Sequence, residues 1–201
     1  MKLLVLIFVL FFYGLVILFR SYLLYKQTGI NPMKLKNDDT AQGFNAMVFS
    51  AIVYSILGMT FLYAFGGKYY DYLVPVPYLE ENSTLKIAGF VISLLAMIWI
   101  FIAQMQMRQS WRIGIDYSEK NELITQGLFS VSRNPIFLGI LISYLGFFLL
   151  MPNMLSFGLG LVSFVSISIQ IRLEESYLSK NNSREYLDYK EMVNRWFGRS
   201  N

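Results

Sequence analysis

The sequence predicts an all-α protein, a polytopic membrane bundle of about five transmembrane helices with a C-terminal helical hairpin and a cytoplasmic tail helix. Three observations lead to this fold class. Of the 201 residues, 55% are hydrophobic and only 15% are charged, whereas about a quarter are charged in ordinary soluble domains. Several apolar runs reach the roughly 20 residues that a helix needs to cross a bilayer. The segments between these runs alternate between rich and poor in Lys and Arg.

Three predicted spans lie in the first half of the chain. They run from Leu3 to about Leu24, from Ala41 to Phe65 and from Leu85 to Met107, and each is long enough to cross a bilayer as a helix. A secretory signal peptide is the alternative for the first span, because Lys2 precedes an apolar run. The length of that run and the lack of a small-residue cleavage pattern favour a span.

A helical hairpin is predicted in the second half. No charged residue occurs in 136–171, and only the Met-Pro-Asn turn signal at 151–153 interrupts the run. The segment therefore predicts two antiparallel spans, each near the lower length limit. The whole chain, 1–201, is then one membrane domain. Residues 1–107 carry three spans, and residues 108–201 carry a loop, the hairpin and the C-terminal helix.

The basic residues predict the orientation. Segment 20–40 contains four Lys or Arg, segment 66–83 one, segment 106–134 four and the tail from residue 172 six. Because Lys and Arg concentrate in cytoplasmic segments, the N-terminus is expected outside and the C-terminus in the cytoplasm. The chain is therefore predicted to be a multi-pass integral protein of the cell (inner) membrane, with the lipid bilayer as its main partner.

The tail is predicted to form a helix from about Arg184, after a cap at Asn182 or Ser183. Its apolar residues follow a spacing of three to four, so one face can lie on the bilayer or on the bundle. They are Tyr186, Tyr189, Val193, Trp196 and Phe197.

The composition excludes whole classes of chemistry. The chain contains no His and no Cys, which excludes thiolate and imidazole metal sites, Ser-His-Asp and Cys-His catalysis, and disulfides. No Rossmann or Walker loop is present, and neither a metal nor a nucleic acid is expected as a partner. Any chemistry must therefore depend on carboxylates, Arg, Lys, Tyr, Asn and the backbone.

Charged residues converge at the cytoplasmic ends of the hairpin. Arg133 immediately precedes its first span, and Glu174 and Glu175 follow its second. Two interpretations are open at this point. Arg133 and Arg172 can be anchors that reach to the interface beside solvated glutamates, or the cluster can be a polar functional site.

The order of motifs favours a functional site. Leu-Ile-Thr-Gln-Gly-Leu-Phe at 123–129 is followed by Arg-Asn-Pro-Ile-Phe-Leu-Gly at 133–139, then the hairpin, the acidic pair and the aromatic tail. Over roughly Ser110 to Phe197, this order resembles the integral-membrane methyltransferases of the isoprenylcysteine carboxyl methyltransferase and phospholipid methyltransferase superfamily. The resemblance implies that S-adenosylmethionine binds at the cytoplasmic edge, between the hairpin ends, the preceding loop and the C-terminal helix.

Arg133, Pro135 and Gly139 match the superfamily motif Arg-His-Pro-x-Tyr-x-Gly, whereas Asn134 replaces its His and Phe137 its Tyr. Asn still donates and accepts hydrogen bonds but does not titrate, and Phe lacks the hydroxyl group. At these two positions the resemblance therefore implies cofactor binding more readily than a role in acid-base catalysis.

The resemblance also implies roles for individual residues. The carboxylate pair can hold the ammonium or ribose hydroxyls of the cofactor, Arg133 can meet its carboxylate, and Gly139 can let the helix backbone approach the ligand. Arg133 and Glu175 are the expected catalytic residues. The expected cofactor contacts are Leu123, Ile124, Gly127, Phe129, Arg133, Asn134, Pro135, Phe137, Gly139, Glu174 and Glu175. The expected substrate contacts are Tyr186, Tyr189, Arg195 and Trp196.

Structural roles stay open for some of these residues. Pro135 suits a first helical turn, Gly127 suits a turn, and the tail aromatics suit interfacial anchors. The leading hypothesis is S-adenosylmethionine-dependent methyl transfer to a lipid-soluble or membrane-interfacial small-molecule acceptor. The alternatives are an NADPH-dependent membrane reductase of the sterol reductase type and a non-enzymatic protein that binds a lipid or a partner subunit.

Overall fold

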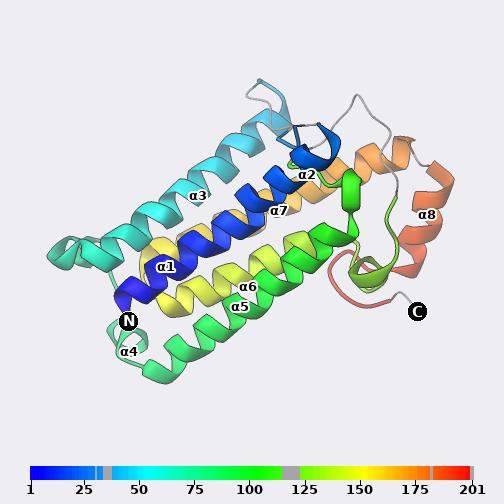
Figure 1. Ribbon diagram of the computed structural model, residues 1–201. Helices are drawn as coiled ribbons and strands as arrows, with labels where there is room; N and C mark the ends of the chain where they lie inside the picture. Colours follow the sequence, from blue (N-terminus) through cyan, green and yellow to red (C-terminus); the bar gives the residue numbers. More distant parts are fainter. Residues whose placement is uncertain (30, 34–37, 115–122, 182, 200–201) are drawn as a thin grey trace.

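The computed structural model describes residues 1–29, 31–33, 38–114, 123–181 and 183–199 as a bundle of long helices (Figure 1). The α-helices are α1 (Lys2–Tyr13), α2 (Arg20–Thr28), α3 (Ala41–Phe65), α4 (Pro77–Glu80), α5 (Ser83–Gln106), α6 (Pro135–Leu150), α7 (Met154–Asn181) and α8 (Ser183–Met192). The shorter helical segments are η1 (Gly14–Phe19), η2 (Gly67–Leu73), η3 (Arg108–Ser110) and η4 (Gly127–Ser130).

The first span is one continuous helix with a π-helical segment, η1, between α1 and α2. The side chain of Gln104 on α5 donates to the carbonyl of Val16 in this segment (3.0 Å). Arg20 is only 2% exposed, and its guanidinium donates to the carbonyls of Gln104 and Arg108. The carbonyl of Gln104 lies in the last turn of α5, where carbonyls lack partners within the helix, and that of Arg108 lies in η3 just beyond it. The charge of Arg20 thus caps a neighbouring helix.

Local caps place the next two spans where the sequence predicts them. The hydroxyl of Thr40 accepts from the backbone N–H of Gly43 at the start of α3 (3.1 Å). The side chain of Asn82 accepts from the N–H of Leu85 at the start of α5 (3.1 Å). Both residues satisfy a donor that the first helical turn leaves free.

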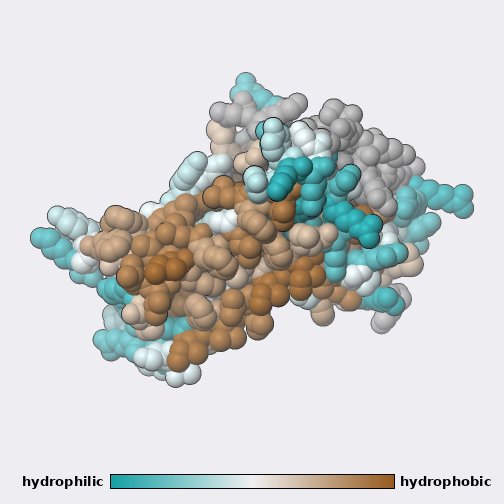
Figure 2. Space-filling model, in the orientation of Figure 1, coloured by the Kyte–Doolittle hydropathy of each residue, from teal (hydrophilic) through white to brown (hydrophobic). Residues whose placement is uncertain are grey.

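The helical membrane bundle is confirmed. Among the described residues, four helices are long and apolar enough to cross a membrane: Lys2–Thr28, Ala41–Phe65, Ser83–Gln106 and Met154–Lys180. The helix α6 is also apolar but has only 16 residues. It lies along α5 and completes the hairpin with α7 (Figure 1). An apolar surface covers the middle of the molecule, and polar side chains gather toward its ends (Figure 2).

Two predicted boundaries are wrong. The second helix of the hairpin does not stop at Ile171, because α7 continues to Asn181. The acidic pair therefore lies within a helix. The tail helix α8 ends at Met192, so Val193, Trp196 and Phe197 are not part of it. They belong to a turn that the N–H of Asn194 closes on the carbonyl of Gly198 (2.9 Å).

The two ends of the bundle collect different segments. The N-terminus and α4 lie at one end, and α2, α8 and the C-terminus lie at the other (Figure 1). At the first end, the N–H of Val76 donates to the carbonyl of Pro152 in the hairpin turn (2.8 Å). At the second end, the N–H of Ile113 donates to the carbonyl of Pro32 (2.9 Å). The second end carries the predicted site segments, namely η4, the start of α6, the end of α7, α8 and the C-terminal turn (Figure 1).

Candidate functional site

The C-terminal turn is fastened to the start of α6 by the backbone. The N–H of Arg133 donates to the carbonyl of Asn194 (3.1 Å), and the N–H of Gly198 donates to the carbonyl of Val131 (2.7 Å). The side chain of Asn134 adds a bond from its amide nitrogen to the carbonyl of Arg195 (3.1 Å). Residues about 60 positions apart in the sequence thus form one face.

Glu175 is the centre of this face. Its carboxylate receives two bonds from Arg195, from Nε (3.0 Å) and Nη2 (2.7 Å), and one from Nη2 of Arg133 (3.0 Å). The side chains of Arg133 and Glu175 are 7% and 11% exposed, and that of Arg195 is 34% exposed. The carboxylate of Glu175 raises the pKa of the Arg195 guanidinium above its usual value, chiefly through their hydrogen bond. One carboxylate therefore holds two guanidiniums, one from the start of α6 and one from the C-terminal turn.

Glu174 does not share this site. Its carboxylate accepts from the amide of Gln170 (2.9 Å), and the oxygen of Gln170 accepts from Asn45 on α3 (3.1 Å). Asn45 in turn accepts from the hydroxyl of Ser166 (2.6 Å). The two carboxylates therefore have different protein partners, and the expectation that both contact the cofactor stays a prediction. Glu174 belongs to a polar chain between α3 and α7, and Glu175 belongs to the site.

Several predicted cofactor contacts have structural roles at the start of α6. Asn134 is buried, at 9% exposure, and its N–H donates to the hydroxyl of Ser132 (3.1 Å). Pro135 occupies the first turn of α6, where its missing N–H costs nothing, and its carbonyl accepts from the indole of Trp99 (2.9 Å). Phe137 is half-buried. The Asn that replaces the usual His keeps a donor, and it uses that donor to hold the tail.

Gly127 and Gly139, the two glycines of the sequence motifs, both lie against side chains of α5 rather than at an open surface. Gly127 has a φ of +63°, and a Cβ there would lie 2.5 Å from the side chain of Gln106, whose oxygen accepts from the N–H of Leu128 (2.8 Å). A Cβ on Gly139 would lie 2.5 Å from the side chain of Ile100 on α5. At Gly139 the close neighbour is therefore α5, and the expected approach of the backbone to a ligand stays a prediction.

The two tyrosines of α8 are packed under the tail. Tyr186 and Tyr189 are 2% and 3% exposed and form a cluster with Val193 and Leu123. The hydroxyl of Tyr189 donates to the carbonyl of Phe129 (2.6 Å). Burial, more than any nearby charge, raises the pKa of Tyr186 to about 12. These contacts give the two tyrosines a structural role, and the expected contact with substrate stays a prediction. Leu123 packs against this cluster, and Phe129 supplies the carbonyl that Tyr189 binds, so both residues hold α8 in place. Ile124 is half-buried.

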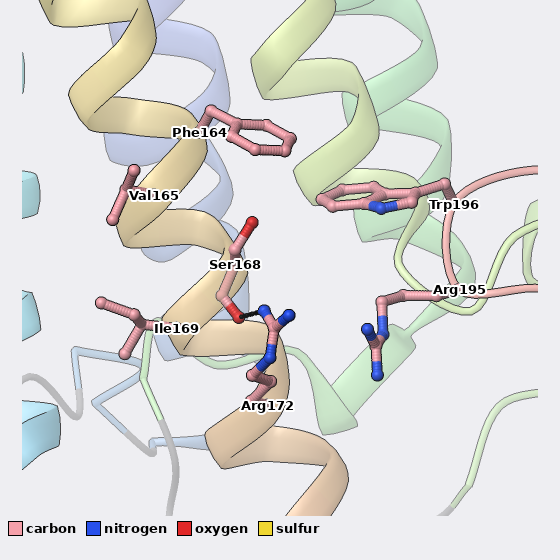
Figure 3. Close-up of a pocket in the computed structure, with 7 residues that line it drawn as sticks. All are labelled: Phe164, Val165, Ser168, Ile169, Arg172, Arg195 and Trp196. Carbon is pink, nitrogen blue, oxygen red and sulfur yellow. Dashed lines mark hydrogen bonds between the residues drawn. The ribbon is translucent and has the colours of Figure 1, made fainter.

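The other two predicted substrate contacts line a pocket. Arg195 and Trp196 face the outer side of α7 across a cavity of about 370 Å³ (Figure 3). The rings of Trp196 and Phe164 are stacked, with centroids 6.3 Å apart and planes at 22°. From α7 the lining residues are Phe164, Val165, Ser168, Ile169 and Arg172.

Sequence reasoning missed the α7 side of this pocket. Arg172 was interpreted only as an anchor, and the other four residues as part of an apolar span. A signal was nevertheless present, because Phe164, Ser168 and Arg172 are four residues apart and share one face of a helix. That signal requires the helix to include Arg172, which the predicted end at Ile171 excluded.

The family of the chain can now be stated. The model of the phospholipid methyltransferase family matches residues 84–185, which is just over half of the 201 residues, and the chain belongs to this family. The matched region contains α6, α7 and all but the first residue of α5, and it includes Arg133 and Glu175. Together with the apolar bundle, it defines a membrane methyltransferase. Neither a curated protein nor a solved structure matches the chain significantly.

Proposed function

We propose that the protein transfers a methyl group from S-adenosylmethionine to a lipid-soluble or membrane-interfacial acceptor. The observation that carries the proposal is the joining of Arg133, Glu175 and Arg195 beside a pocket that borders the apolar surface. A polar anchor for a soluble cofactor thereby lies next to a route for an apolar substrate.

The residues present fit part of this cofactor. Nε of Arg133 is a buried donor without a partner among the described residues, and a buried donor gains free energy when an acceptor reaches it. The carboxylate of S-adenosylmethionine is such an acceptor, and guanidinium groups bind carboxylates well. Glu175 already accepts three hydrogen bonds. Its proposed role is therefore to position Arg133 and Arg195 rather than to bind the cofactor ammonium.

The proposed chemistry makes modest demands on the protein. S-adenosylmethionine supplies a methyl group activated by a positively charged sulfur, so the chain must mainly position the reactants and keep water out. The Glu175 ion pairs fix the guanidiniums, and the packed tail shields them. Arg195 and Trp196, which line the pocket, are the proposed contacts with the acceptor.

The proposed orientation places this end of the bundle in the cytoplasm, with the N-terminus outside the cell (inner) membrane. The segments that meet here are the ones rich in Lys and Arg, which favours a cytoplasmic location. The cofactor would then enter from the compartment in which it is soluble, and the acceptor from the bilayer.

Binding of S-adenosylhomocysteine to the purified full-length protein, measured by titration calorimetry, tests the proposal. The wild type should bind, and Arg133→Ala and Glu175→Ala should weaken binding at least about tenfold, the equivalent of one lost charged hydrogen bond. Arg184→Ala is the matched control, because Arg184 is exposed on α8. NADPH should not compete. Failure of the wild type to bind, or competition by NADPH, would overturn the assignment.

The acceptor requires a separate measurement. Membranes supplied with S-adenosylmethionine that carries a labelled methyl group should yield a labelled lipid-extractable product with the wild type. The product should be absent with Arg133→Ala. Label that appears only in water-soluble compounds would contradict an interfacial acceptor.

A further inference from the structure

We propose that Arg20, on the first span, is a positioning residue for S-adenosylmethionine, because it orders the end of α5 that holds η4. Arg20 lies outside the region 84–185 that matches the family. The first span thereby contributes to the cofactor site as well as to the anchoring of the chain. The inference rests on the proposed function where it concerns the cofactor, whereas the ordering of η4 can be measured without any ligand.

The guanidinium of Arg20 is buried among neutral partners. Its residue is 2% exposed, and its Nη2 donates to the carbonyls of Gln104 (3.2 Å) and Arg108. The ring centroid of Trp111 lies 5.1 Å from its Cζ. Burying a charge costs free energy unless hydrogen bonds replace its hydration. An apolar side chain would fill the same space without that cost, so packing alone does not account for a guanidinium at this position.

The two carbonyls that Arg20 binds lie on either side of Gln106, the last residue of α5. Arg108, two residues further on, has a φ of +48°. Glycine is the usual residue where the chain turns into the left-handed region just past a helix, because a Cβ makes that conformation costly. The bond from Arg20 stabilises this turn. It therefore fixes the end of α5 in a conformation that the local sequence does not favour.

Gln106 connects the end of α5 to the predicted cofactor loop. Its Oε1 accepts from the N–H of Leu128 (2.8 Å), and its side chain lies against Gly127. The carbonyl of Phe129, also in η4, accepts from the hydroxyl of Tyr189 on α8 (2.6 Å). Because η4 leads into the start of α6, an ordered η4 places both the predicted loop and the residues at which the candidate site begins.

This arrangement predicts an effect on cofactor affinity and not on the chemical step. Without Arg20, the end of α5 and η4 would populate other conformations, and the cofactor would have to order them as it binds. The apparent affinity falls by the fraction of protein that is not competent to bind. The loaded enzyme would have the same geometry as the wild type. A variant that is only partly unfolded behaves differently, because kcat then falls while KM is unchanged.

The kinetics of methyl transfer in membranes, followed by labelled lipid product, test the proposal. Arg20→Met should raise the KM for S-adenosylmethionine about tenfold and leave kcat within about twofold of the wild type. Lys86→Met is the matched control, because Lys86 is also a buried cation, 7% exposed, but lies at the start of α5 at the other end of the bundle. Its KM should equal that of the wild type. An equal rise in both variants, or a lower kcat at unchanged KM in Arg20→Met, would overturn the inference.

Two further variants test the connection and protect the experiment. Gln106→Met should raise KM in the same way, and the double variant with Arg20→Met should differ little from either single variant, because both act through one contact. Effects that multiply in the double variant would show that the two residues act independently. Arg20→Lys keeps the charge but not the planar group that lies near Trp111. It should raise KM to a smaller extent, and it serves as the test if Arg20→Met does not fold.

Hydrogen exchange on the full-length protein without ligand separates the inference from the proposed function. The peptide that contains Leu128 should exchange faster in Arg20→Met than in the wild type and in Lys86→Met, because its N–H bond to Gln106 opens more often. Equal exchange in the three proteins would overturn the inference, whatever the KM values. A wild type that binds no S-adenosylhomocysteine, together with faster exchange in Arg20→Met, would overturn the proposed function and leave the ordering of η4 by Arg20 in place.

Discussion

Glu174 and Glu175 are neighbours in the chain with different surroundings, because successive residues of a helix point about 100° apart. Glu175 faces the start of α6 and the tail and holds two guanidiniums. Glu174 faces Gln170 and, through it, α3. A carboxylate beside two cations fixes the position of both, whereas a carboxylate beside neutral amides continues a polar chain inside the bundle. Only Glu175 therefore fixes the position of side chains at the candidate site.

This difference predicts unequal effects of two matched substitutions. Glu175→Gln should destabilise the protein by about 1–3 kcal/mol, because it leaves the guanidinium of Arg133 buried without a carboxylate. Glu174→Gln should cost less, since the new side chain keeps an oxygen that can accept from Gln170. Thermal unfolding in detergent measures both. Equal losses in the two variants would contradict the assignment of Glu175 as the organising residue.

The raised pKa of Tyr186 predicts that the folded protein loses stability at alkaline pH. Its pKa is about 12 in the folded protein, against about 10 in an unfolded chain. Between these values the folded state binds more protons than the unfolded state. Stability is therefore intact below pH 10 and falls as the pH rises from 10 to 12. The full loss corresponds to about 2–3 kcal/mol.

Tyr186→Phe should remove this contribution, so the variant should lose less stability than the wild type between pH 10 and pH 12. Thermal unfolding at a series of pH values measures the difference. Parallel curves for the two proteins would show that Tyr186 ionises as readily in the folded state as in the unfolded chain. Below pH 9 the two proteins should behave alike.

At the scale of elements, close packing of α5 and α6 determines where the site begins. A Cβ on Gly89 would lie 2.8 Å from the carbonyl oxygen of Gly146, and a Cβ on Gly146 would lie equally close to that of Gly89. Small residues let helix backbones approach in a membrane, where packing rather than water drives association. Because α6 is short, its contact with α5 has a large influence on the position of Arg133 and Asn134.

Gly146→Ala should therefore push the two helices apart and lower the unfolding temperature, with a cost of about 1–3 kcal/mol for overpacking. Gly158→Ala is the control, because a Cβ at Gly158 on α7 would meet nothing within 4 Å. The control should be neutral or slightly stabilising. Comparable losses in both variants would indicate a general intolerance of alanine rather than a close contact between α5 and α6.

The elements differ in how far the sequence predicts them. The span Ala41–Phe65 agrees residue for residue with α3, because length, hydropathy and an N-cap all coincide there. The ends of α7 and α8 could not be predicted in this way. The residues after Ile171 are polar enough to end a span but not to end a helix. The turn after Met192 depends on bonds from Gly198 and Arg133 to distant backbone groups, which no local pattern encodes.

The candidate site was predictable in part for similar reasons. The order of motifs led to Arg133, Glu175 and Arg195, since a hairpin necessarily returns its two ends to one side. It did not distinguish residues that face the pocket from residues that support it. Tyr189 bonds to Phe129, and Gly139 meets Ile100. Both roles depend on which side of a helix faces a neighbour, and that is decided by packing.

At the scale of the whole molecule, the bundle has an apolar middle and two polar ends (Figure 2). The site lies at the end where α2, α8 and the C-terminus meet (Figure 1). A cofactor with several charges cannot cross the apolar middle without a large loss of hydration free energy. The proposed function therefore requires this end to face the cytoplasm, and the orientation becomes a test of the function as well as of the fold.

The absence of Cys from the chain makes the orientation directly measurable, because any introduced thiol is the only one. Tyr72 is 81% exposed at the end that holds the N-terminus, and Arg184 is exposed on α8 at the other end. In intact spheroplasts, a membrane-impermeant maleimide should label Tyr72→Cys but not Arg184→Cys. Permeabilisation should make the second variant reactive. The positive-inside distribution of Lys and Arg is the physical reason for this expectation. Labelling of Arg184→Cys in intact spheroplasts would place the site outside, away from the cytoplasmic cofactor, and would contradict both the orientation and the proposed reaction.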